Sequence, residues 1–198
     1  MNSFTLWFST GMEHILDFSG YDHILFVSLL VLTFPPSDWK KVLILITAFT
    51  VGHSISLALS VINSLHLNQG LIEFLIAFSI LLSATYNLVF YKNPPKRGKS
   101  FLYLIVTFFG LIHGLGFSFL LRVMLGHEEN ILAPLLYFNL GLELGQIVIV
   151  SVVLLFSLLT IYLFKWPYQI FKLIPVCLIV IISLKMCIER LLQLFQSS

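Results

Sequence analysis

Residues 131–163, ILAPLLYFNLGLELGQIVIVSVVLLFSLLTIYL, form the longest apolar stretch of the chain and contain one charged residue, Glu143. A helix needs about 20 mostly apolar residues to cross a bilayer, and this stretch is longer. Lipid offers no water to backbone polar groups, so a spanning segment must satisfy them within a helix. The stretch therefore predicts a transmembrane helix that is long enough to tilt or to protrude.

The composition of the whole chain agrees with a membrane protein. Of its 198 residues, 59% are hydrophobic and only 10% are charged, whereas a soluble domain carries about 25% charged residues. Polar and proline-containing turns separate six apolar stretches. These predicted spans are residues 20–34, 41–61, 71–91, 101–121, 131–163 and 170–193. We expect an all-α, polytopic integral membrane protein, a bundle of about six transmembrane helices that forms a single domain over residues 1–198.

Basic residues predict the orientation of this bundle. The loops after the first, third and fifth spans share one side of the membrane. They contain eight basic residues, which are Lys40, Lys41, Lys92, Lys96, Arg97, Lys99, Lys165 and Lys172. Because cytoplasmic loops are enriched in Lys and Arg, this side is expected to be cytoplasmic and both termini are expected outside.

Ionisable residues inside the spans are the strongest functional signal, because they are costly in lipid. Asp22 and His23 lie in the first span, His53 in the second, His113 in the fourth and Glu143 in the fifth. A rise of about 1.5 Å per residue places all of them between the outer border and the mid-plane. We therefore expect one buried polar cluster at a single depth.

Imidazole and carboxylate groups from different helices can form a metal site, and they suit zinc, nickel and cobalt. The predicted metal ligands are His14, Asp22, His23, His53, His113 and Glu143. Of these, His14 is expected just outside the first span, as a first-contact ligand. The predicted supporting polar residues are Ser54, Asn139 and Gln146. A proton relay without metal and a purely structural polar network remain alternatives, and His66 and His127 fall in polar turns.

Five short segments carry a family resemblance. In chain order they are GMEHI (11–15), GYDHILF (20–26), FTVGHS (49–54), FGLIHGLGF (109–117) and FNLGLELGQ (138–146). Together they resemble the HupE/UreJ family of bacterial membrane proteins, in particular its shorter branch. The resemblance implies a six-span inner-membrane protein associated with nickel or cobalt uptake, with metal handling by a His upstream of an Asp-His pair. Here His14 stands eight positions before Asp22, a longer spacing than in the best-described nickel permeases of the family.

The second and fifth spans also resemble each other. Phe49-Thr-Val-Gly-His-Ser54 in one echoes Phe138-Asn-Leu-Gly-Leu-Glu143 in the other, through the shared Phe and Gly. These spans run in opposite directions, so a division into three plus three spans predicts an inverted repeat. Inverted repeats with a binding site at their interface are common in secondary transporters.

Two functions fit these observations best, and a binding or accessory protein is a further alternative. The first is a permease for a divalent transition metal, nickel or cobalt, with an external His/Asp/Glu site. The alternative is a metal-dependent intramembrane hydrolase that acts on a lipid or a membrane-anchored peptide, in which a zinc-bound water is the nucleophile. Whether the protein is an enzyme stays open at this point. The expected partners are the lipid bilayer and the metal ion, and no nucleic acid is expected.

Overall fold

The computed structural model describes residues 2–63, 68–92, 99–125 and 131–196. Within these residues the secondary structure is entirely helical, which confirms the all-α prediction. The elements are α1 (Ser3–Leu16), α2 (Asp22–Thr33), the short 3-10 helix η1 (Pro36–Asp38), α3 (Trp39–Asn63), α4 (Gln69–Val89), α5 (Lys99–Leu125), α6 (Leu132–Phe164) and α7 (Tyr168–Gln196).

Five helices, α3 to α7, are long and apolar enough to cross a membrane. Their outward faces carry large apolar side chains, such as Leu104 on α5 and Val152 and Phe156 on α6, which are each more than half exposed. Such a surface is unfavourable in water but suits lipid. The protein is therefore a multi-pass membrane protein.

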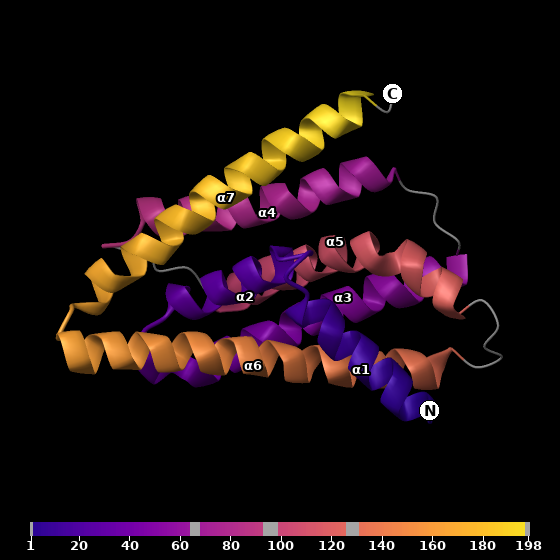
Figure 1. Ribbon diagram of the computed structural model, residues 1–198, viewed down its shortest axis with the longest axis horizontal. Coiled ribbons are helices and arrows are strands. Elements are labelled where there is room, and N and C mark those ends of the chain that lie inside the picture. The colour runs from indigo at the N-terminus through magenta and orange to yellow at the C-terminus, as the bar shows by residue number, and fades with distance from the viewer. Residues whose placement is uncertain (1, 64–67, 93–98, 126–130, 197–198) are drawn as a thin grey trace.

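The first predicted span differs from the structure. Helix α2 has only 12 residues, which rise about 18 Å and are too few to cross a bilayer alone. Helix α1, which was expected outside the membrane, lies beside α6, and α2 continues from α1 along the length of the bundle (Figure 1). Helix α1 contains polar residues such as Ser9, Thr10 and Glu13, so its mean hydropathy does not identify it as a membrane segment.

Close helix packing through glycine explains the position of α1. A methyl group on Gly11 would collide with the backbone carbonyl of Phe138, and one on Gly141 would collide with that of Phe8. The two helices therefore pack in parallel with their backbones nearly touching, as small residues permit in membranes.

Helices α3 and α5 pack in the same way. Gly52 of α3 lies against the carbonyl of Thr107, and Gly110 of α5 lies against the carbonyl of Phe49. A third extensive interface joins α4 to α7, and these helices are antiparallel, since Gly70 meets Leu194 while Glu73 meets Arg190. Three pairs of helices, α1 with α6, α3 with α5 and α4 with α7, thus form most of the bundle.

Both termini lie at one end of the bundle, which we call the terminal end (Figure 1). The opposite end, which we call the basic end, contains the start of α3, the end of α4 and the connection from α6 to α7. Its lysines include Lys40, Lys41, Lys92, Lys165 and Lys172, and α5 starts there at Lys99. The orientation of the two ends relative to the cell stays a prediction.

Candidate metal centre

Four imidazoles from four helices meet inside the bundle. They are His14 of α1, His23 of α2, His53 of α3 and His113 of α5, and we call them the histidine cluster. The ring of His23 is central, with its centroid 4.7 Å from that of His14, 5.8 Å from that of His53 and 5.3 Å from that of His113. The predicted juxtaposition of His23, His53 and His113 is thus present, and His14 joins them.

The imidazole nitrogens of the cluster are buried and lack hydrogen-bond partners among the described residues. This holds for Nε2 of all four rings and also for Nδ1 of His53. One nitrogen from each of His14, His23 and His53 can be chosen so that all three lie within 4.8 Å of one another. A buried polar atom without a partner is costly and rare in folded proteins. A ligand shared by these nitrogens removes that cost.

Two contacts orient the rings. Nδ1 of His113 lies 2.8 Å from the carbonyl oxygen of Phe109. A carbonyl only accepts, so this nitrogen carries the proton and Nε2 keeps its lone pair. Nδ1 of His23 lies 3.0 Å from Oδ1 of Asp22. A carboxylate behind the ring is a common companion of a metal-bound histidine, because it fixes the tautomer and the orientation of the ring.

The break between α1 and α2 is what brings His14 and His23 together. Nine positions separate them in the sequence. In a continuous helix, residues nine positions apart lie on opposite faces and about 13.5 Å apart along the axis. Helix α1 ends at Leu16 and α2 begins at Asp22, so each half helix aims its own histidine at the same point. Membrane transporters build ion sites from interrupted helices of this kind.

Aromatic rings cover the cluster on both sides along the bundle axis, and these residues were missed from the sequence. Toward the basic end, Phe26 lies 5.0 Å from Phe49 and 6.0 Å from Phe109 between ring centroids. Toward the terminal end, Phe117 stacks on Phe138 at 5.3 Å. Their spacing was a usable signal, because Phe49, Phe109 and Phe117 each stand four positions from a cluster histidine.

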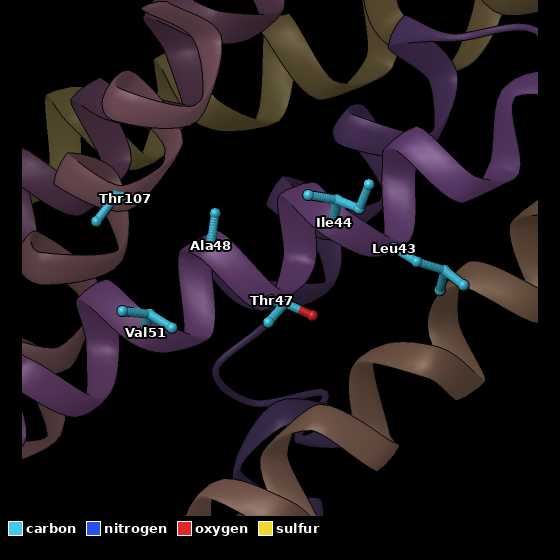
Figure 2. A pocket seen from close by; sticks show the side chains of 6 residues that line it. All are labelled: Leu43, Ile44, Thr47, Ala48, Val51 and Thr107. Carbon is cyan, nitrogen blue, oxygen red and sulfur yellow. The ribbon is translucent and has the colours of Figure 1, made fainter. Parts of the chain in front are cut away.

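The predicted supporting residues and Glu143 form a separate hydrogen-bonded line between α3 and α6, which we call the polar seam. Its three bonds are Thr47 to Glu143 at 2.8 Å, Thr50 to Gln146 at 2.9 Å and Ser54 to Asn139 at 2.6 Å. Figure 2 shows Thr47 on the side of α3 that faces α6, beside an open groove of about 500 Å³. The described contacts join Glu143 to Thr47 and place no imidazole on its carboxylate, so a ligand role for Glu143 stays a prediction.

Two further ionisable residues of the predicted spans, Glu73 and Lys185, have partners of their own. Glu73 pairs with Arg190 at 2.8 Å, and Lys185 lies 3.6 Å from Glu189. Neither pair belongs to the histidine cluster. The turn histidines His66 and His127 lie outside the described residues.

Comparison with known proteins confirms the resemblance found in the sequence. A family model described as HupE / UreJ protein matches residues 1–190, which extends beyond the five segments on both sides. No curated protein and no solved structure matches the chain.

Proposed function

Because the chain belongs to the HupE/UreJ family, we propose that it is a permease of the bacterial inner membrane that moves a divalent transition-metal ion, nickel or cobalt. The family is associated with nickel and cobalt transport. The histidine cluster is the proposed binding site for the ion in transit.

One observation carries this proposal, which is the convergence of buried imidazole nitrogens that have no hydrogen-bond partner among the residues that the structure describes. Neutral imidazole is a good ligand for nickel, cobalt and zinc. Magnesium and calcium instead prefer oxygen ligands. The chemistry of the donor set therefore supports a borderline transition metal as the substrate.

The residues around the cluster have complementary roles in this proposal. His14, His23, His53 and His113 replace the water molecules that the ion loses on entry. Asp22 holds the ring of His23 and adds a negative charge that offsets part of the charge of the ion. The ligands come from four helices, so small relative movements of the helices are enough to weaken the site and release the ion.

A flux measurement tests the proposal. Purified protein is placed in liposomes that contain a dye quenched by nickel or cobalt. The wild type is expected to quench the dye faster than empty liposomes do, with a rate that saturates with external metal. His53→Ala is expected to behave like empty liposomes, and His66→Ala, the matched control in a predicted polar turn, like the wild type.

A different result would favour the hydrolase alternative. If the wild type matched empty liposomes and yet purified with tightly held zinc, transport would be abandoned. A firmly bound ion that exchanges slowly suits catalysis, whereas a transported ion must leave its site within each cycle.

A further inference from the structure

We propose that Phe138 and Phe49 are two equivalent gates, one at each side of the histidine cluster, which open in alternation. This inference rests on the proposed permease function and identifies the residues that would control access to its site. It follows from an inverted repeat that relates the two halves of the chain.

The first evidence is a pair of matched sequence patterns. Gly11-x-x-His14 on α1 corresponds to Gly110-x-x-His113 on α5. Phe138-x-x-Gly141 on α6 corresponds to Phe49-x-x-Gly52 on α3. The correspondence makes α5 the counterpart of α1 and makes α6 the counterpart of α3.

The second evidence is that the same correspondence holds for helix contacts. The three most extensive interfaces are α1 with α6, α3 with α5, and α4 with α7. The correspondence pairs α1 with α5, α3 with α6 and α4 with α7. When each helix is replaced by its counterpart, the interface of α1 with α6 becomes that of α5 with α3, and the interface of α4 with α7 stays the same. Helices α1 and α6 start at the terminal end, whereas α3 and α5 start at the basic end (Figure 1). The two halves are therefore related with opposite direction across the membrane.

The third evidence is atomic. Gly11 lies against the carbonyl of Phe138, and its counterpart Gly110 lies against the carbonyl of Phe49. The ring of His14 lies 5.9 Å from that of Phe138, and the ring of His113 lies 5.1 Å from that of Phe49. Each phenyl ring thus packs on the corresponding histidine through the same backbone arrangement, and Phe49 also lies 6.2 Å from His23 and 6.1 Å from His53.

The two rings close the cluster toward opposite ends of the bundle. Phe138 and Phe49 are both 0% exposed. Phe138 stacks on Phe117 at an interplanar angle of 12°, and Phe49 packs on Phe26 at 33°. An ion that leaves the cluster along the bundle axis must displace one of these aromatic pairs. Both pairs thus cover the cluster toward the two ends of the bundle, while His14 is only partly buried and the side chain of Asp22 is 22% exposed.

The test measures release of bound metal rather than flux. Full-length protein is loaded with nickel and mixed with EDTA, for the wild type, Phe138→Leu, Phe49→Leu and the control Phe171→Leu. Leucine keeps most of the buried volume, so the fold is retained, but it cannot reproduce the ring stack. Phe171 is similarly buried and packs away from the cluster, against Phe156 and Tyr168. Both gate variants are expected to keep the metal stoichiometry and release nickel about tenfold faster, and the control is expected to match the wild type.

Sided vesicles then test the equivalence. With the protein inserted in one orientation, Phe138→Leu is expected to speed release only to EDTA on the side of the terminal end. Phe49→Leu is expected to speed release only to EDTA on the side of the basic end. Unchanged release in both variants, or acceleration on the same side, would overturn the gates even if the wild type carries metal flux. A wild type that binds no metal would overturn the permease and the gates together.

Discussion

The histidine cluster and the polar seam are both polar regions inside an apolar bundle, but their polar atoms are satisfied differently. In the seam, three side chains of α3 each meet a side chain of α6 at hydrogen-bonding distance, and the amide nitrogen Nε2 of Gln146 is its one buried side-chain atom without a partner among the described residues. In the cluster, buried imidazole nitrogens point at one another without partners among the described residues. A hydrogen-bonded line holds two helices together, whereas a group of unpartnered donor atoms needs a ligand. From this comparison we infer that the seam holds α3 and α6 together and that the cluster binds the metal ion.

The largest effect is expected from the loss of one imidazole of the cluster. His53→Ala removes a fully buried imidazole and is expected to weaken nickel or cobalt binding by about 100-fold or more, because it removes a direct ligand where even a supporting contact is worth 10–100-fold. Calorimetry or equilibrium dialysis on purified protein would measure this. An affinity equal to that of the wild type would show that the cluster is not the binding site.

A somewhat smaller effect is expected when the ring of His23 loses its carboxylate. Asp22→Asn keeps the size of the side chain but removes the charge next to Nδ1 of His23. Metal affinity is expected to fall by about 10-fold to 100-fold, the usual effect of losing such a companion group. Asp38→Asn is a suitable control, because Asp38 pairs with Lys41 outside the cluster. Equal losses in both variants would remove the specific role of Asp22.

Helix spacing tests how the cluster is assembled. Gly110→Ala places a methyl group against the carbonyl of Phe49 and pushes α3 away from α5. We expect a loss of about 1–3 kcal/mol in stability together with weaker metal binding, because His53 and His113 move apart. Gly20→Ala is the control, since its methyl group would meet only Asp17 at an ordinary 3.6 Å. Thermal unfolding in detergent with and without metal would show both effects, and an unaffected Gly110→Ala protein would contradict the packing argument.

The smallest effect is expected in the seam. Ser54→Ala removes its bond to Asn139 and should cost about 0.6 kcal/mol of stability, the typical worth of an interhelical hydrogen bond in a membrane. Metal affinity should stay at the wild-type value. A double-mutant cycle with Asn139→Ala would measure the pairwise contribution. A large loss of metal affinity with unchanged stability would show that the seam contributes to metal binding and not to holding the helices together.

Much of the architecture could be predicted from the sequence. Helices α3 to α7 follow from runs of apolar residues. A bilayer requires a minimum length of any apolar segment that crosses it, and the segment must form a helix to satisfy its backbone hydrogen bonds. The proximity of His23, His53 and His113 followed from their similar depth, since the position of a residue along a membrane-crossing helix gives its height in the bilayer. The family also followed from five short segments.

Other features depended on angles and distances between helices, which residue number does not determine. Residues 3–16 precede the first predicted span, which placed His14 just outside it, yet they form α1, Gly11 packs closely against α6, and His14 lies in the cluster. Glu143 lies at a depth that suited the metal site, but its side chain meets Thr47.

The sequence by itself determined that this chain is a multi-pass helical membrane protein of the HupE/UreJ family with polar groups at one depth. Only the tertiary structure decided which of those groups face one another. The depth of a side chain follows from the position of its residue along the helix. The direction in which it points depends on how the helix is rotated about its axis and on the close helix approach that glycines such as Gly11 and Gly110 permit. Those close approaches place four imidazoles together between two aromatic layers and leave Glu143 in a separate hydrogen-bonded seam.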